Sequence, residues 1–556
     1  MRLLPFLAVA TLGTVVAAQE PTAGGAVAAD APATEPTLRG RLRTIRVTTG
    51  DIFDEKTKAE RPLAALVDAL HWTTREEVVR RELWFAEGDV VDSSMVAELE
   101  RNLRALGLFA EARARLVPTE VTGEVDLEVT TRDRLSITFG GGASFVGGVT
   151  GLRAAIGESN LLGYGNRLVG SFAESSDGEY RGSLVYSDLH ILDTWHTGGV
   201  RLSRTDDGDS IGLEVQRPFK HLADPRSYGL ALAHDELATD FFRNGDSVAE
   251  VPELRSSLTA DLLWANGPRE HRDKLGFVLT AVQRDYEPAR GVLAPAFRVP
   301  GDTDSVFFGP TWSTRWIQGF RKVNNVDTLD FVQDVVLGAN VAATVGARWR
   351  DEDGRGAEVQ PEASVEASWA AEPFAHVLTN VAARGGGRWT GAGDAAWRAG
   401  ATARAFLLLA EWNTLATFVD FDAVEETQDL IVELTLGEDN GLRGYGARQF
   451  AGTRRLRSVV ENRLDTGLEV ATLRLGLVAF ADFGRTGTDG DLGPTYRSVG
   501  AGLRIGSRPL LGDGVFRVDF AKPLDDVLGE NDGWQVSLTV GQVFTFGSNT
   551  TVAATR

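Results

Sequence analysis

The stretch WQVSLTVGQVFTF, from Trp534 to Phe546, decides the fold class of this chain because apolar and polar residues alternate along it. One face carries Trp534, Val536, Leu538, Val540, Phe544 and Phe546, and the other carries Gln535, Ser537, Thr539, Gly541 and Thr545. Period-two alternation is typical of a β-strand that separates two environments. At about 3.3 Å per residue and a tilt of roughly 45°, the stretch spans about 30 Å, the thickness of a bilayer core. The pattern predicts a membrane-crossing strand.

A second stretch, TLRLGLVAFADF, repeats the alternation and adds charges to one face. Its apolar face carries Leu473, Leu475, Leu477, Ala479, Ala481 and Phe483, and its other face carries Arg474, Gly476, Val478, Phe480 and Asp482. An Arg or Lys that faces lipid at the midplane costs about 2–4 kcal/mol, so the charged face must line a lumen. The segments SVGAGLRI and VFRVDFA likewise place Arg504, Arg517 and Asp519 inward.

A soluble β-sandwich is the alternative fold, since its strands also alternate, but these strands exceed the usual length of about five or six residues. In lipid, strands satisfy every backbone hydrogen bond only in a closed barrel. We therefore expect a mainly β fold in which residues 134–546 form a transmembrane antiparallel β-barrel. Sixteen strands would leave roughly 26 residues for each strand and its connection, and sixteen is the number that we predict.

The composition limits both partners and chemistry. The 556 residues carry a formal net charge of −21, which argues against nucleic acid as a partner because nucleic acid calls for a basic patch. There is no cysteine, so disulfides and thiolate metal sites are excluded. The seven histidines show no metal-ligand spacing, and GDSIG, from Gly208 to Gly212, lies in a hairpin pattern rather than between a strand and a helix. We expect no enzyme activity, no metal and no cofactor.

The N-terminal residues predict export. A basic Arg2, an apolar run and small residues at Val16 and Ala18 are typical of a secretory signal peptide over residues 1–18. Residues 19–38 are rich in Ala, Pro, Thr and Gly, and we predict that they form a flexible linker.

Residues 39–133 are predicted to form a small α+β domain. LRTIRV alternates like a strand, and Thr73 and Thr74 stand three residues ahead of glutamates, which is a capping-box spacing for a first helix. DSSMVAELERNLRALGLF has helical spacing at Val96, Leu99, Leu103 and Leu106, with Gly107 as a C-cap. EARARLVP and EVDLEVTT then form a hairpin pattern. The element order and the LRALGLF phrase resemble a POTRA domain, a periplasmic module of outer-membrane assembly factors, although residues 51–72 form a longer connection than that module needs.

The stretch GLRGYGARQFAG, from Gly441 to Gly452, holds an arginine between small residues. Taken alone, a glycine-rich outer loop with a solvated arginine explains it equally well. Downstream, ENR begins at Glu461 and FADFG begins at Phe480, and alternation already places Asp482 in the lumen. A guanidinium grips a carboxylate with a planar fork of donors, and a confined lumen screens such a pair less than an open surface does.

These segments resemble the motifs of the BamA/TamA-type outer-membrane assembly superfamily, in which POTRA domains precede a bacterial surface antigen barrel. The matching loop residues are Leu442, Arg443, Gly444, Tyr445, Phe450 and Gly452, and the matching wall residues are Glu461, Arg463, Phe480, Asp482 and Gly484. The resemblance implies that the loop folds back into the barrel and that its arginine meets an acidic residue on the inner wall. We therefore predict a lumenal pair between Arg443 and Asp482, with Glu461 and Arg463 beside it.

The last strand has a second predicted role. Thr539, Gly541, Phe544 and Phe546 resemble the signal by which outer-membrane proteins of this type are delivered for insertion, and residues 547–556 continue as a polar tail. A seam between the first and last strands would offer unpaired backbone groups to an incoming strand, and Gly541 would leave room there.

A second candidate edge lies in the small domain. The strand near Glu111, Arg113 and Arg115 is the predicted edge for an unfolded client, with a charge-protected solvated edge as the alternative.

The resemblance implies an outer-membrane protein whose small domain lies in the periplasm and which inserts or translocates other proteins without nucleotide hydrolysis. The implied partners are the lipid bilayer and unfolded outer-membrane or secreted client proteins, with periplasmic accessory subunits or chaperones as further candidates. A two-partner secretion transporter for one dedicated exoprotein is the first alternative, and a passive outer-membrane channel is the second.

Overall fold

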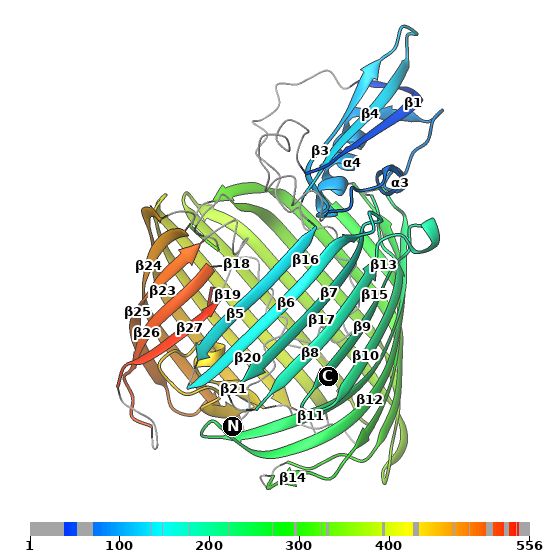
Figure 1. The fold of residues 1–556 in the computed structure, drawn as a ribbon. Helices are drawn as coiled ribbons and strands as arrows, with labels where there is room; N and C mark the ends of the chain where they lie inside the picture. Colours follow the sequence, from blue (N-terminus) through cyan, green and yellow to red (C-terminus); the bar gives the residue numbers. More distant parts are fainter. Residues whose placement is uncertain are drawn as a thin grey trace.

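The fold comprises a small N-terminal domain and a large β-barrel (Figure 1). The computed structural model describes residues 38–52, 71–134 and most of 136–543. Within the last range the omitted residues are 147, 177, 222, 269–270, 294–296, 324, 328, 330–332, 392–394, 426–432, 471–472, 489, 507–514, 528–532 and 541. The predicted signal peptide 1–18, nearly all of the linker 19–38, most of the 51–72 connection and the tail 547–556 lie outside the described residues.

The N-terminal domain packs two helices on a four-stranded sheet. Its elements are β1 (Arg39–Gly50), α3 (Glu76–Arg81), β2 (Val90–Asp92), α4 (Ser93–Ala105), β3 (Phe109–Pro118) and β4 (Glu124–Asp133). The sheet order is β2-β1-β4-β3, with β1 parallel to β4 and β3 antiparallel to β4. Leu99 and Leu103 of α4 are fully buried against Leu127 of β4. The expected order of elements is present, with the short β2 added between the helices.

The two helices begin for different physical reasons. Asp92 caps α4, because its side chain accepts hydrogen bonds from the backbone nitrogens of Ser94 and Met95 at 2.9 and 3.1 Å. Gly107 follows the helix with a φ of 71°, in agreement with the predicted C-cap. The capping box predicted for α3 is wrong, since Arg75 occupies the N-cap and makes no side-chain cap. The backbone nitrogen of Thr74 instead donates to the Asp133 carboxylate at 2.6 Å, so a tertiary contact replaces the local one.

The barrel is a closed ring of antiparallel strands. The strands are β5 (Ile137–Val146), β6 (Val149–Leu161), β7 (Asn166–Ser175), β8 (Tyr180–Asp188), β9 (Thr197–Thr205), β10 (Asp209–Arg217), β11 (Arg226–Arg243), β12 (Asp246–Asn266), β13 (His271–Tyr286), β14 (Arg290–Gly291), β15 (Thr303–Val323), β16 (Gln333–Glu352), β17 (Gly356–Phe374), β18 (Val377–Trp389), β19 (Ala395–Ala410), β20 (Asn413–Glu425), β23 (Arg454–Val470), β24 (Leu473–Gly487), β25 (Tyr496–Gly506), β26 (Val515–Pro523) and β27 (Gln535–Val540). A ladder pair between Leu538 and Phe145 closes the ring between β27 and β5.

The fold is mainly β and the barrel is closed, as predicted, but the prediction of sixteen strands is wrong. Leaving aside the two-residue β14, the described residues form a ring of 20 strands. The sequence estimate allowed too many residues for each strand. The strands from β7 to β10 contain only 9 or 10 residues each, and they are joined by short turns, so the same length of chain crosses more often.

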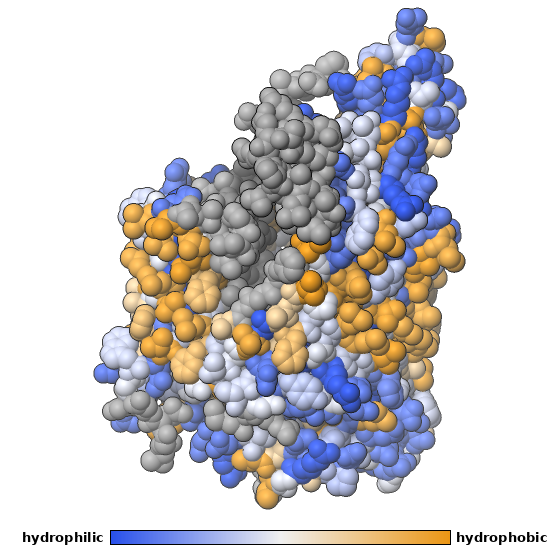
Figure 2. Space-filling view, viewed as in Figure 1, coloured by the Kyte–Doolittle hydropathy of each residue, from blue (hydrophilic) through white to orange (hydrophobic). Residues whose placement is uncertain are grey.

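The two faces of the barrel wall are those that alternation predicts. On β24, Val478, Phe480 and Asp482 are buried on the inner face, whereas Leu477 and Phe483 are 44% and 40% exposed. Arg504 and Asp519 are also buried inside. Figure 2 shows an apolar belt on the outer wall, between more polar surfaces at the two ends. Among the described residues, no helix is long and apolar enough to cross a membrane.

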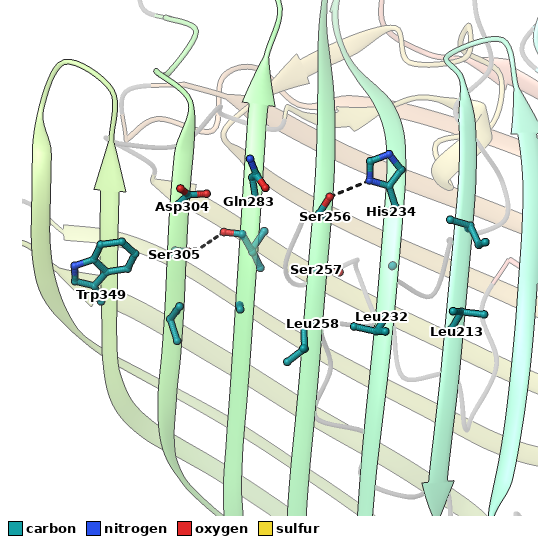
Figure 3. Close-up of a pocket in the computed structure, with 15 residues that line it drawn as sticks. Leu213, Leu232, His234, Ser256, Ser257, Leu258, Gln283, Asp304, Ser305 and Trp349 are labelled. Carbon is teal, nitrogen blue, oxygen red and sulfur yellow. Dashed lines mark hydrogen bonds between the residues drawn. The ribbon is translucent and has the colours of Figure 1, made fainter.

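One border of the apolar belt is visible as two neighbouring rows on the outer wall (Figure 3). Register joins the apolar row Leu213, Leu232, Leu258, Ala281, Val306 and Trp349. The next row is polar and comprises His234, Ser256, Gln283 and Asp304, with His234 Nδ1 2.9 Å from Ser256 Oγ. A hollow of about 650 Å³ lies over both rows. An aromatic residue at such a border is typical of a membrane interface.

The N-terminal domain docks on turns at one end of the barrel (Figure 1). Trp195 Nε1 donates to the Arg81 carbonyl and Asn102 Nδ2 to the Lys220 carbonyl, both at 2.9 Å. The buried Glu82 carboxylate lies 2.8 Å from His190 Nε2 and 3.4 Å from Lys220 Nζ. We call this the domain end of the barrel and the opposite one the far end.

Candidate functional site

The site is built around the connection between β20 and β23, which lies at the far end because the strands run alternately up and down. Its described residues, 433–452, are called the lid loop. They include β21 (Leu434–Leu436), the 3₁₀ turn η2 (Glu438–Asn440) and β22 (Phe450–Gly452). Leu442, Arg443 and Tyr445 are 0–2% exposed, so the loop is folded into the lumen and does not extend into solvent.

Arg443 binds three carboxylates of the inner wall. Its Nε and Nη2 donate to the two oxygens of Asp482 at 2.8 and 2.7 Å, which is the bidentate geometry expected for arginine. Its Nη1 donates to Glu461 at 2.8 Å and to Asp519 at 3.4 Å. All four side chains are fully buried, and the guanidinium carbon lies 3.4 Å from the centre of the Phe480 ring.

Two glycines give the lid loop its close approach to the wall. A Cβ added to Gly484 on β24 would lie 2.7 Å from a Leu436 methyl carbon, so any larger residue would push the loop side chains away from the wall. Gly444 has a φ of 88°, a conformation that other residues rarely adopt, and it turns the chain directly after Arg443. The turn at Gly444 explains why a glycine follows the arginine.

Aromatic residues hold the next part of the lid loop. Tyr445 and Phe450 pack with Tyr496 of β25, and the Phe450 and Tyr496 rings stack 3.8 Å apart. Tyr445 Oη donates to the Arg497 carbonyl at 2.8 Å. Burial raises the pKa of Tyr445 to about 12, so the phenol stays protonated and remains a donor.

A second arginine attaches the lid loop to the other side of the ring. The Arg448 guanidinium lies 4.6 Å from the centre of the Phe242 ring on β11 and 3.8 Å from Glu179 in the β7–β8 turn. Glu433 accepts a hydrogen bond from the Phe242 backbone nitrogen at 2.7 Å. In the strand order, β11 lies across the ring from β24. The lid loop therefore spans the far end from wall to wall.

The structure brings most of the predicted site residues together. Leu442, Arg443, Gly444, Tyr445, Phe450 and Gly452 belong to the lid loop, and Glu461, Arg463, Phe480, Asp482 and Gly484 lie on β23 and β24 beneath it. The other predicted residues lie elsewhere. Thr539 is on β27, whereas Gly541, Phe544 and Phe546 lie outside the described residues. Glu111, Arg113 and Arg115 are on β3, an edge of the N-terminal sheet.

Sequence reasoning missed several contacts of the lid loop. Asp519 was assigned to the lumen by alternation but not to Arg443, because alternation gives the face of a residue and not its partner. Its neighbour Arg504 donates to Asp519 at 2.6 Å. Arg448, Phe242 and Glu179 come from three separate parts of the chain, and no sequence signal connects them.

No protein-family model matches this chain. It is 30% identical over 134 residues to the outer membrane protein assembly factor BamA of Neorickettsia risticii, covering 23% of this chain and 17% of the relative. It is 27% identical over 220 residues to the BamA of Neisseria meningitidis serogroup B, covering 37% of this chain and 25% of the relative. The matched residues thus span a quarter or less of the length of either relative.

Solved structures with a similar arrangement are BamA from Haemophilus ducreyi lacking POTRA domains 1–3 and CdiB from Acinetobacter baumannii. The first is 13% identical, with 90% of this chain and 84% of that chain covered and a TM-score of 0.43. The second is 12% identical, with 90% and 74% covered and a TM-score of 0.46. The two sequence matches show that parts of this chain are similar to BamA outer membrane protein assembly factors.

Proposed function

We propose that this protein lies in the outer membrane and inserts or translocates other protein chains there without a nucleotide. The observation that carries the proposal is the buried lid loop, in which Arg443 binds Asp482 and Glu461. This arrangement occupies the segments whose sequence resembles the motifs of the assembly superfamily. The sequence matches to BamA proteins support the same class of function.

The placement in the membrane is supported by the barrel wall. Its outer face carries exposed Leu, Val, Phe and Trp side chains, and its inner face carries buried charges such as Arg255, Arg350 and Asp420. Charges inside and apolar residues outside are the arrangement that lipid requires of a barrel. We propose that the N-terminal domain is a POTRA domain in the periplasm, which makes the domain end the periplasmic end and the far end the extracellular one.

The proposed mechanism uses exposed strand edges. An unfolded client chain pairs first with an edge of the N-terminal sheet and then with the seam between β5 and β27, because backbone donors and acceptors at an edge add a strand without needing a particular sequence. Folding of the client supplies the driving force. The lid loop keeps the lumen closed while no client is engaged.

Depletion of the protein, followed by an inventory of the outer-membrane proteome, tests the proposed function. Loss of many outer-membrane proteins is the expected result. Loss of one exoprotein with an otherwise normal proteome would identify a two-partner secretion transporter instead, and an unchanged proteome would favour a passive channel. Re-expression of the intact chain is the control, because it should restore the lost proteins.

Crosslinking tests the N-terminal edge. A photo-crosslinker at Arg113 of β3, whose side chain is 77% exposed, should trap unfolded outer-membrane chains in cells. The matched control is Ala97, which is exposed but lies on α4 and not on a strand edge. Equal trapping at both positions, or no trapping at Arg113 in an active protein, would exclude β3 as the client-binding edge.

A further inference from the structure

The connection between β15 and β16, at the domain end, has described residues that are buried in the lumen. These residues, 325–327 and 329, are called the inner turn. Val326 is fully buried, and Asn325 and Leu329 are 6% and 7% exposed. The Val326 side chain packs in an apolar cluster on the inner wall that comprises Val335, Leu378, Phe406, Ala416, Phe418 and Val459. The inner turn is therefore seated on the wall.

Arg463 of β23 holds the backbone of the inner turn. Its Nη1 donates to the Val326 carbonyl, and its own carbonyl accepts from Asn325 Nδ2 at 3.1 Å. Its Nε donates to Glu461 Oε2 at 2.9 Å. The other oxygen of Glu461 accepts from Arg443 of the lid loop at 2.8 Å. One buried carboxylate thus lies between a loop from the far end and a turn from the domain end.

The charges of this cluster decide what Arg463 can bind. Among the described residues, the cluster holds four guanidiniums, Arg443, Arg463, Arg504 and Arg517, and three carboxylates, Glu461, Asp482 and Asp519. With the lid loop in place, cations exceed anions by one. Within this cluster Arg463 donates both to a carboxylate and to the neutral carbonyl of Val326.

Withdrawal of the lid loop removes Arg443 and leaves three guanidiniums facing three carboxylates. Asp482 then loses the two hydrogen bonds of its bidentate contact with Arg443. It is buried, so water screens its charge poorly.

Glu461 also loses the Arg443 contact at one oxygen, which leaves that oxygen open to Arg463. A shift of the Arg463 guanidinium toward it would draw Nη1 away from the Val326 carbonyl. The inner turn would then lose the Arg463 side-chain contact but keep its apolar contacts and the Asn325 hydrogen bond to the Arg463 carbonyl.

We propose that the two segments are coupled through Glu461 and Arg463, so that release of the lid loop at the far end releases the inner turn at the domain end. This coupling does not rest on the proposed function, since it concerns the barrel alone.

Single-cysteine labelling of the full-length protein in detergent measures the coupling. The chain has no cysteine, so Val326→Cys gives one reporter, buried while the inner turn is seated. We expect Arg443→Ala to speed its reaction with a membrane-impermeant maleimide by at least about 5-fold, the lower end of the usual range for coupling between sites. Arg443→Gln, which removes the same charge but keeps more of the side-chain volume, should act alike.

Arg455→Gln is the matched control. Arg455 is a buried lumenal arginine that also contacts the lid loop, through the Thr435 carbonyl at 2.9 Å, but its carboxylate partners are Asp420 and Asp422. It should leave the labelling rate unchanged. Heat-modifiable gel mobility shows that each variant is folded. An unchanged rate in the folded Arg443 variants, or an equal increase in Arg455→Gln, overturns the coupling.

Discussion

Arg443→Ala is expected to release the lid loop and to destabilise the closed barrel by about 3–5 kcal/mol, the usual cost of removing one partner of a buried ion pair. The substitution leaves Asp482, Glu461 and Asp519 buried around an empty space, and it removes the guanidinium that packs on Phe480. The measurement is the temperature at which the folded barrel loses its fast mobility on a gel, together with the ability of the variant to replace the intact protein in depleted cells.

Removal of Arg443 and removal of Asp482 should have unequal effects on stability, because Arg443 also binds two other carboxylates. After Asp482→Ala, Arg443 still binds Glu461 at 2.8 Å and Asp519 at 3.4 Å, so a smaller loss is expected than for Arg443→Ala. The double variant should be little worse than Arg443→Ala, because residues in one network are not additive. Additive losses would show that the two residues act separately.

Arg384→Ala serves as the control for the removal of a lumenal arginine. Arg384 donates to Asp422 at 2.5 Å, and Asp422 keeps a second arginine, Arg455, at 2.8 Å. A small effect is expected, since no carboxylate is left without a cation. A loss as large as that of Arg443→Ala would mean that any lumenal arginine has this effect and that the lid loop is not special.

Much of the barrel wall and the contact between Arg443 and Asp482 could be predicted, because they follow from patterns among residues that are near in the sequence. Alternation fixes the face of each strand residue, which placed Asp482, Arg504 and Asp519 in the lumen. The motif resemblance also named Gly484, and the structure places it on β24 against Leu436 of the lid loop. Alternation placed Asp482 on the lumenal face of its strand, and the motif resemblance then identified it as a partner of Arg443.

The remaining features depend on distances along the chain that no local rule specifies. The strand number follows from the length of every turn, and the β7–β10 strands are shorter than the average assumed for the whole barrel. Arg448 meets Phe242 only because β11 lies across the ring from β24, which in turn depends on the strand number. Likewise, the Thr73 and Thr74 pattern was overridden by Asp133, a residue that folding brings close.

Glu82→Ala is expected to release the N-terminal domain from the barrel. Glu82 lies at the end of α3, and its carboxylate meets His190 from the β8–β9 turn and Lys220 from the β10–β11 turn. Removing it leaves Lys220 without this counter-charge at the interface, at a cost of about 3–5 kcal/mol. The matched control is Glu76→Ala, which removes an exposed glutamate of the same helix whose partner Arg80 is also exposed. Faster proteolytic cleavage between β4 and β5 in Glu82→Ala alone is the expected result.

Acid should release the domain in the same way. Burial by itself would raise the pKa of Glu82, but the hydrogen bond with His190 and the charge of Lys220 outweigh it and hold the pKa below its ordinary value of 4.5. A carboxylate with a depressed pKa contributes stability that is fully present above its ordinary value and is lost as the pH falls through the lowered one. Cleavage between β4 and β5 should therefore stay slow down to about pH 4.5 and accelerate below it. In Glu82→Ala the cleavage should already be fast at neutral pH and should change less on acidification. The same acid dependence in both proteins would assign the acid-sensitive docking to another titratable contact, of which the ion pair between Arg81 and Asp193 is the nearest candidate.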